Sequence, residues 1–168
     1  MALEIGPISF NKEVGALLEA ENLPTADLRT AARLSNRNDQ TSRNPVELFG
    51  ARCDDELKGL VGLEYYGHVA LLRSLVVHQN FRHSGSGRLL VDFAERQAAL
   101  SGVRTLYLLT TTAADYFARI GYQALSRDDA PAAIATTAQF SDLCPSSASF
   151  MAKTLFTSDE SVPADVEV

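Results

Sequence analysis

The residues of this sequence best suited to chemistry stand where an apolar run ends near Val77 and a helical pattern begins near Leu89. The stretch between them holds Arg82, His83, Ser84, Gly85, Ser86 and Gly87. A helix begins with backbone N–H groups that lack partners, and its N-terminus carries partial positive charge. Glycines let those groups approach a bulky anion. The stretch therefore predicts a phosphate site, to which Arg82 adds a cationic fork and Ser84 or Ser86 a hydroxyl.

The spacing of the glycines decides what kind of phosphate site is expected. No Gly-Lys-Ser/Thr follows, so the mononucleotide P-loop pattern is absent, and the Gly-x-Gly-x-x-Gly pattern of dinucleotide sites is absent too. The pattern present is Arg-x-x-Gly-x-Gly, from Arg82, Gly85 and Gly87. In this setting it resembles the coenzyme A pyrophosphate loop of the GNAT acetyltransferase superfamily. An ordinary strand–helix turn is the alternative interpretation.

Further motifs extend this resemblance over about residues 58–122. An aliphatic run, LLRSLVV, ends just before the loop, and LYLL follows the helix. Ala113, the pair Tyr116-Phe117 and the pair Gly121-Tyr122 then match the family's spacing. The phrases GLEYYG, LLRSLVV, LYLLTTTAADYFARIGY and CPSSASFM are similar to acetyltransferases associated with arsenic-resistance gene sets. That likeness indicates a setting and does not name a substrate.

The resemblance implies how the cofactor would lie. Acetyl-coenzyme A would run along the strand at 69–77, its pantetheine arm pairing with the strand's backbone where the sheet splays. A main-chain N–H of that strand would polarise the thioester carbonyl, as in an oxyanion hole. The implied cofactor contacts are Leu75, Val76, Val77, Arg82, His83, Ser84, Gly85, Ser86, Gly87, Arg88, Thr110, Ala113 and Phe117.

The implied reaction is direct transfer of an acetyl group to an amine, which must first lose a proton to a base or a water chain. Glu64, at the end of the strand next to the cofactor strand, is the candidate base, although it could instead be a solvent-facing residue before a turn. His68 and His78 are alternatives. In the family a tyrosine commonly protonates the leaving sulfur, but the matching position here is Phe117. The proton donor is then Tyr116, Tyr122 or solvent; these two tyrosines and Glu64 are the catalytic candidates.

Arg73 gives the strongest indication about the acceptor. It stands inside an apolar run, where an unpaired charge would be costly. Its partner is either an internal carboxylate such as Glu64 or the carboxylate of an amino-acid-like substrate held by a bidentate fork. The second alternative is favoured, which makes Arg73, Ser74 and Glu64 the expected substrate-binding residues.

Other conspicuous residues carry less weight. Arg33, Arg37 and Arg43 fall near the variable loop that covers the acceptor in this superfamily, but a solvated face is the favoured interpretation. Cys53 and Cys144 are far apart in sequence. Two free structural thiols are expected from them, with no disulfide and no metal site.

Length and composition limit the remaining alternatives. The 168 residues carry a net charge of −6 and no dense block of Lys or Arg, so nucleic acid is not an expected partner. No apolar run approaches the roughly 18 residues that span a bilayer, and the N-terminus is a poor signal peptide. A cytoplasmic protein is expected, and by analogy a homodimer. Residues 1–156 should form one acetyltransferase domain, and 157–168 an acidic, disordered tail.

Hydrophobic periodicity predicts the elements that must position these residues. Helices are expected at about 12–21 with Asn11 as N-cap, and at 26–34, 88–100, 113–120 and 131–138. Strands are expected at about 3–8, 46–53, 58–65, 69–77, 103–109, 122–125 and 150–156. This order predicts an α+β domain with a twisted mixed sheet of six to seven strands and helices on both faces.

The sequence therefore predicts an acetyl-coenzyme A-dependent N-acetyltransferase that acts on a small amine, such as an amino-acid analogue or an organoarsenical. Two alternatives stay open. One is a protein N-acetyltransferase. The other is a catalytically silent acyl-coenzyme A sensor, which the phenylalanine at position 117 keeps under consideration.

Overall fold

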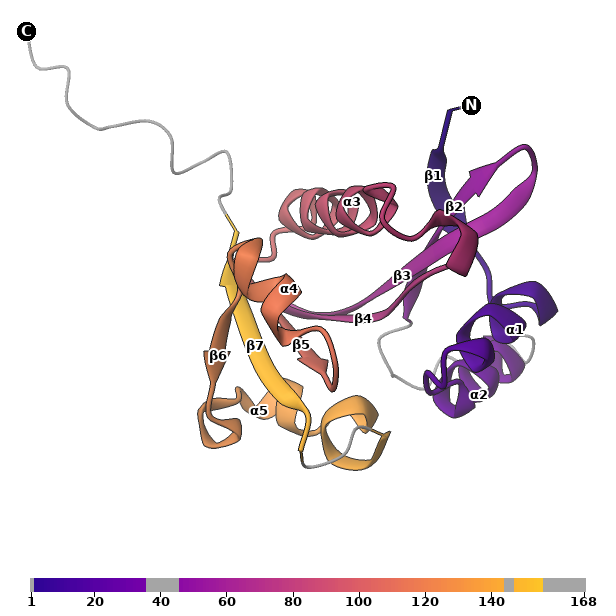
Figure 1. Ribbon diagram of the computed structural model, residues 1–168. Coiled ribbons are helices and arrows are strands. Elements are labelled where there is room, and N and C mark those ends of the chain that lie inside the picture. Colours follow the sequence, from indigo (N-terminus) through magenta and orange to yellow (C-terminus); the bar gives the residue numbers. More distant parts are fainter. Residues whose placement is uncertain (1, 36–45, 144–146, 156–168) are drawn as a thin grey trace, which may run out of the picture.

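The computed structural model describes residues 2–35, 46–143 and 147–155. Within these ranges seven strands form one mixed sheet, in the order β1-β2-β3-β4-β5-β7-β6 (Figure 1). Every neighbouring pair is antiparallel except β4 and β5. The predicted α+β class is confirmed. The strands are β1 (Glu4–Ile8), β2 (Glu47–Cys53), β3 (Glu56–Tyr66), β4 (Val69–Val77), β5 (Thr105–Thr110), β6 (Gln123–Leu125) and β7 (Ser149–Thr154).

Five α-helices lie between the strands of the described ranges: α1 (Lys12–Ala20), α2 (Ala26–Ser35), α3 (Ser86–Leu100), α4 (Ala114–Arg119) and α5 (Ala132–Ala135). Asn11 caps α1 as predicted, because its side-chain oxygen accepts a hydrogen bond from the N–H of Val14 at 2.9 Å. The predicted end of the last helix at residue 138 is wrong, because α5 ends at Ala135. The hydroxyls of Thr136 and Thr137 bond back to carbonyl groups of that helix, which competes with its continuation.

Helices cover both faces of the sheet, as expected (Figure 1). Alternation along β2 turns Phe49 toward α3 and Leu48 toward α1. On β3, Val61 and Leu63 join the α3 side, and Leu60 joins the α1 side. A buried apolar cluster lies on each of these two faces of the sheet. Helices α3 and α4 pack on one face, and α1 and α2 pack on the other.

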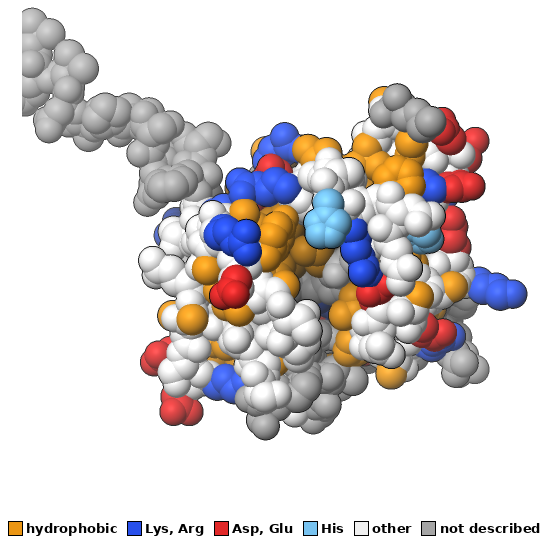
Figure 2. Space-filling model, viewed as in Figure 1, with side chains coloured by type: hydrophobic (Ala, Val, Ile, Leu, Met, Phe, Trp, Pro, Cys, Tyr) orange, Lys and Arg blue, Asp and Glu red, His pale blue; other side chains and the backbone are white. Residues whose placement is uncertain are grey.

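The sheet opens between β4 and β5. These strands pair only over Val69–Leu72, against Thr105–Leu108, and they then diverge (Figure 1). The edge of β4 that faces β5 is therefore unpaired from Arg73 to Val77 within the described residues. This is the splay that the family resemblance implies. Seen from the same side, the surface is hollowed near its centre, with Lys, Arg and His side chains above the hollow (Figure 2).

A bulge in β4 accompanies the opening. Val76 pairs with Leu60 of β3, but Arg73 already pairs with Gly62, so Ser74 and Leu75 together stand opposite Val61 alone. Ser74 adopts a left-handed conformation, with φ at 56°. Such bulges increase local twist and redirect side chains. Here the bulge lies where β4 loses its β5 partner.

Some expectations fall outside the described residues. The domain boundary at 156, the acidic tail at 157–168, Arg37, Arg43 and Cys144 belong to this group, as does the side chain of Arg33. Among the helices that are described, none is long and apolar enough to cross a membrane.

Candidate active site

The glycine–serine loop joins β4 to α3 as predicted. A 3-10 turn, Gln79–Phe81, follows the strand, and α3 then begins at Ser86. Left-handed conformations at His83 (φ 64°) and Gly85 (φ 82°) turn the chain into the helix. Within the described chain, none of the six backbone N–H groups from His83 to Arg88 has a hydrogen-bond acceptor. Six free donors at a helix N-terminus form a strong site for an anion.

The two serine hydroxyls serve the loop itself. Ser84 Oγ donates to the carbonyl of Phe81, so Ser86 Oγ is the donor in the 2.7 Å bond between the two serines. Ser86 is only 6 % exposed. Both hydroxyl protons are thereby used, which leaves the backbone as the principal source of donors.

The arginines of the loop also have partners. Arg82 donates from Nε to the carbonyl of Val77 at 3.2 Å and pairs with Glu21, at the end of α1, at 2.5 Å. Arg88 pairs with Asp92 one turn along α3 at 2.9 Å. The side chains of Arg82 and Arg88 are 40 % and 48 % exposed, and exposed pairs contribute little energy. They can therefore turn toward an anion at small cost.

Gly87 has no packing reason to be glycine. A Cβ atom there would lie 3.6 Å from Val77 Cγ2 and 3.7 Å from the Tyr116 hydroxyl, which are ordinary contact distances. Gly87 is the second residue of α3, and glycine favours a helix less than alanine does. The absence of a side chain leaves the backbone of this first helical turn open to close approach by a ligand.

The other expected cofactor residues lie around the opening. Val76 is buried among the α1 cluster, while Leu75 and Val77 pack toward α3. Thr110 accepts a hydrogen bond from the N–H of Ala113 at 3.0 Å and so shapes the start of α4. These residues adjoin the unpaired edge of β4 or the end of β5.

Phe117 faces the core instead. It is 4 % exposed, and its ring packs edge-on between those of Tyr116 and Tyr122. It belongs to the α3-side cluster. Its expected contact with the cofactor stays a prediction.

A second group of functional side chains lies on the α2 side of β3 and β4. Arg73 donates from Nη1 to Glu64 Oε1 at 2.6 Å and also to Asp27, whose other oxygen accepts from Nη2 at 2.9 Å. Tyr66 donates its hydroxyl to Glu64 Oε2 at 2.5 Å, and Arg73 Nε reaches Ser74 Oγ at 3.2 Å. We call Asp27, Glu64, Tyr66 and Arg73 the carboxylate cluster.

Burial makes these contacts strong. The Arg73 side chain is 1 % exposed, that of Glu64 8 % and that of Asp27 23 %. Burial opposes the charge of Arg73, but its hydrogen bonds and attraction to Asp27 and Glu64 outweigh burial and raise the pKa of Arg73. Burial, followed by the bond to Glu64, raises the pKa of Tyr66 above its usual range, so its hydroxyl remains a donor.

The structure thus gives Arg73 the internal partner that the sequence offered as one of two alternatives. Sequence reasoning missed Asp27 and Tyr66. Asp27 is 46 positions from Arg73 and comes from the first turn of α2. The sequence pointed to Asp27 only indirectly, because a buried arginine needs more than one hydrogen-bond acceptor.

The remaining proton-transfer candidates lie elsewhere. Tyr122 is 2 % exposed and donates to Glu95 at 3.0 Å, and the same carboxylate binds Lys153. Burial and then the charge of Glu95 raise the pKa of Tyr122. His68 and His78 are exposed and contact backbone groups of Gly102 and Asn80. None of these three belongs to the carboxylate cluster.

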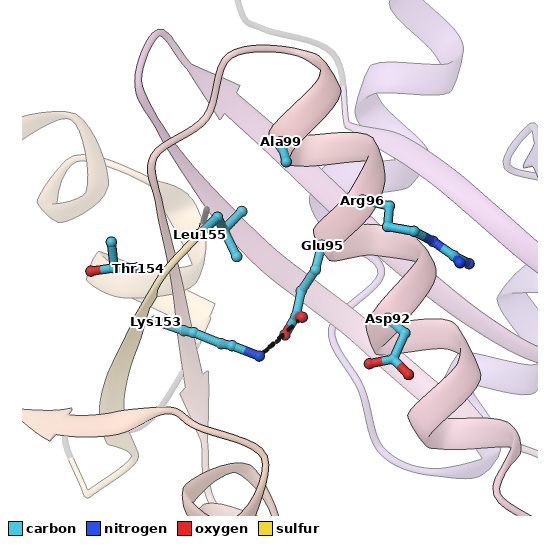
Figure 3. Close-up of a pocket in the computed structure, with 7 residues that line it drawn as sticks. All are labelled: Asp92, Glu95, Arg96, Ala99, Lys153, Thr154 and Leu155. Carbon is cyan, nitrogen blue, oxygen red and sulfur yellow. Dashed lines mark hydrogen bonds and ion pairs between the residues drawn. The ribbon is translucent and has the colours of Figure 1, made fainter. Parts of the chain in front are cut away.

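Figure 3 shows the setting of Glu95, whose carboxylate meets the ammonium group of Lys153 across a pocket between α3 and the end of β7. Lys153 also donates to the carbonyl of Ile120 at 3.0 Å. The pair ties β7 to α3 and to the turn after α4. The pocket is lined by Asp92, Glu95, Arg96, Ala99, Lys153, Thr154 and Leu155.

No group of three or more potential metal ligands occurs among the described residues. Cys53 is buried, and its thiol donates to Asp54 Oδ2 at 3.9 Å.

Comparison with known proteins shows which family the chain belongs to. The sequence profile of the acetyltransferase (GNAT) family matches residues 15–122. The chain belongs to the GNAT family. Two curated relatives are an uncharacterized N-acetyltransferase of Chlorobaculum tepidum, CT2212, which is 33% identical over 51% of this chain, and the amino-acid acetyltransferase of Pseudomonas syringae, which is 36% identical over 41%. The matches span 55% and 16% of those proteins.

Solved structures show the same GNAT fold. N-acetylglutamate synthase of Neisseria gonorrhoeae, complexed with coenzyme A and N-acetyl-glutamate, has a TM-score of 0.70 at 17% identity. The superposition covers 93% of this chain and 36% of that one. A GNAT acetyltransferase of Staphylococcus aureus Mu50 has a TM-score of 0.69 at 18% identity and is covered completely, for 92% of this chain. The PaiA N-acetyltransferase of Thermoplasma acidophilum, in complex with coenzyme A, has a TM-score of 0.60 at 16% identity, with 92% and 99% covered.

Proposed function

We propose that this GNAT protein transfers an acetyl group from acetyl-coenzyme A to the amine of a small molecule. The observation that carries the proposal is the run of free N–H groups from His83 to Arg88, placed at the end of the unpaired edge of β4. Two of the structural neighbours were solved with coenzyme A, which supports the same ligand here.

The residues that would hold acetyl-coenzyme A fit it. The N–H groups of 83–88 suit its diphosphate, and the free edge of β4 suits the amides of its pantetheine arm. When bound, acetyl-coenzyme A supplies the acetyl group as a thioester. A backbone N–H near the bulge at Ser74 and Leu75 would polarise the thioester carbonyl.

Glu64 is the proposed base. It is buried, and Tyr66 and Arg73 fix both oxygens of its carboxylate. That arrangement holds an acceptor for the proton of the incoming amine. For Arg73 we now propose a positioning role, because Asp27 and Glu64 already occupy its guanidinium. Arg73 and Ser74 would thus shape the acceptor site without binding a substrate carboxylate.

The finer identity of the acceptor belongs to the same proposal. The name of the Pseudomonas syringae relative favours an amino-acid-like amine. The motif resemblance favours an arsenic-resistance setting, in which an organoarsenical amino acid is one such amine. A cytoplasmic homodimer is proposed by analogy. Light scattering of the purified chain tests the dimer.

The test of the proposed function is thiol release from acetyl-coenzyme A in the presence of a panel of amino acids, simple amines and lysine-containing peptides. Release with a small amine supports the proposal, and release with peptides alone would favour a protein N-acetyltransferase. The sensor alternative, which the core position of Phe117 keeps open, predicts heat protection by acetyl-coenzyme A with no release for any amine.

A further inference from the structure

The hydroxyl of Tyr116 is buried and has no hydrogen-bond partner among the described residues. The hydroxyls of Tyr66 and Tyr122, in contrast, each donate to a carboxylate. Leaving a buried polar group unpaired costs about 1–3 kcal/mol. An orphan of this kind indicates that the partner is supplied from outside the chain.

The surroundings of that hydroxyl indicate the chemistry of the missing partner. Tyr116 stands in the first turns of α4, and its oxygen comes within 3.7 Å of the position that a Cβ atom of Gly87 would take. Val77, the last residue of β4, adjoins the same position at 3.6 Å. The Tyr116 hydroxyl thus lies beside the first turn of α3, where the free N–H groups are.

The hydroxyl can act there as a donor. Burial raises the pKa of Tyr116, with the negative charges of Asp92 and Glu95 acting in the same direction against Arg88. The hydroxyl therefore keeps its proton at neutral pH. A neutral donor beside several N–H donors fits a ligand that offers many acceptor oxygens.

We infer that Tyr116 is a binding residue for the diphosphate of coenzyme A and is not the acid that protonates the leaving sulfur. This inference rests on the proposed function. It assigns Tyr116 to the same anion as the N–H groups of Gly87 and Arg88.

The length of β4 argues against the acid role. The reacting sulfur is bonded to the thioester carbonyl, which the proposed function sets at the bulge of Ser74 and Leu75. The Tyr116 hydroxyl lies instead beside Gly87, which also adjoins Val77 at the end of the strand. From Ser74 to Val77, at about 3.3 Å per residue, the strand runs on the order of 10 Å. A proton donor has to reach within about 3 Å of the atom it protonates.

The experiment compares two acetyl donors in the Tyr116→Phe variant. Acetyl-coenzyme A carries the diphosphate, and S-acetylpantetheine lacks it. For acetyl-coenzyme A, kcat/KM should fall about ten- to a hundredfold through KM, since a hydrogen bond to a charged group is lost, while kcat at saturation stays the same. For S-acetylpantetheine, kcat/KM should not change.

Two results would overturn the inference. An equal loss with both donors, or a fall in kcat with an unchanged KM, would mean that Tyr116 acts at the sulfur or only on the fold. Full activity with both donors would mean that the hydroxyl binds nothing. Tyr65→Phe is the matched control, because the Tyr65 hydroxyl interacts with Glu47 and Ser101 at the far end of α3.

Calorimetry with coenzyme A separates this inference from the proposed function. If the wild-type chain did not bind coenzyme A, that result would contradict the proposed function itself. Wild-type binding that is unchanged in Tyr116→Phe would remove only the role of Tyr116.

Discussion

Nη1 of Arg73 lies 2.6 Å from Oε1 of Glu64, and both side chains are buried. The two residues come from neighbouring strands at the point where a bulge in β4 shifts the register. Asp27 approaches the same guanidinium from α2. An arginine in the middle of the sheet is therefore neutralised within the protein, and the pair links the fold to the proposed chemistry.

Replacing Arg73 should lower the free energy of unfolding. In Arg73→Met, Glu64 and Asp27 lose their counter-ion, and removing one partner of a buried pair costs about 3–5 kcal/mol. Urea denaturation measures the change. The double variant Arg73→Met/Glu64→Gln should recover part of the loss, because one uncompensated charge is gone. Wild-type stability in Arg73→Met would contradict the buried pair.

Replacing Glu64 should lower kcat in a pH-dependent way. In Glu64→Gln the amine must reach the site already neutral, so the loss of about 10²–10⁴-fold should be largest at low pH. It should shrink as pH rises toward the pKa of the acceptor amine. A pH profile of kcat for both proteins measures the difference.

Asp27→Asn is the control for that experiment. It also removes one carboxylate from Arg73, but Asp27 is not the proposed base. A pH-dependent loss of the same size in Asp27→Asn would show that the network, and not Glu64 itself, governs proton transfer.

Gly87→Ala should separate stability from cofactor binding. The folded chain has room for the methyl group, and alanine favours the helix, so the free energy of unfolding should stay equal or rise by up to about 1 kcal/mol. Coenzyme A affinity should fall, because the methyl group occupies the approach to the N–H groups. Denaturation and calorimetry measure the two effects, with the exposed Leu89→Ala on the same helix as control. Unchanged affinity in Gly87→Ala would count against the loop as the diphosphate site.

Tyr122→Phe should weaken the fold and leave kcat unchanged, because the Tyr122 hydroxyl is bonded to Glu95. The expected loss is about 1–3 kcal/mol. The raised pKa of Tyr122 sets the pH dependence. The contribution of the Tyr122 hydroxyl to the free energy of unfolding is complete below the pKa of about 10 that tyrosine has in the unfolded chain. It is lost as the pH rises above that value, because the unfolded tyrosine ionises first. Urea denaturation at about pH 8 and about pH 11 should show a smaller difference at the higher pH. A fall in kcat would instead support Tyr122 as the acid.

The sequence determined much of this protein on its own. Alternating and helical periodicity located each strand and the four longer helices of the described ranges, because burial of a face leaves its spacing in the chain. The loop from Arg82 to Gly87 could be predicted from the sequence for a related reason. A helix N-terminus presents backbone groups, so its chemistry depends on neighbours in sequence that glycine leaves open.

Only the tertiary structure decided the partners of the side chains. Asp27 meets Arg73 because α2 folds over β4, and Tyr122 meets Glu95 because the chain after α4 returns to α3. The choice between an internal and a substrate carboxylate for Arg73 depended on such contacts. Periodicity tells which face a side chain occupies, but a hydrogen bond depends on where a distant segment lands, and local spacing carries no record of that.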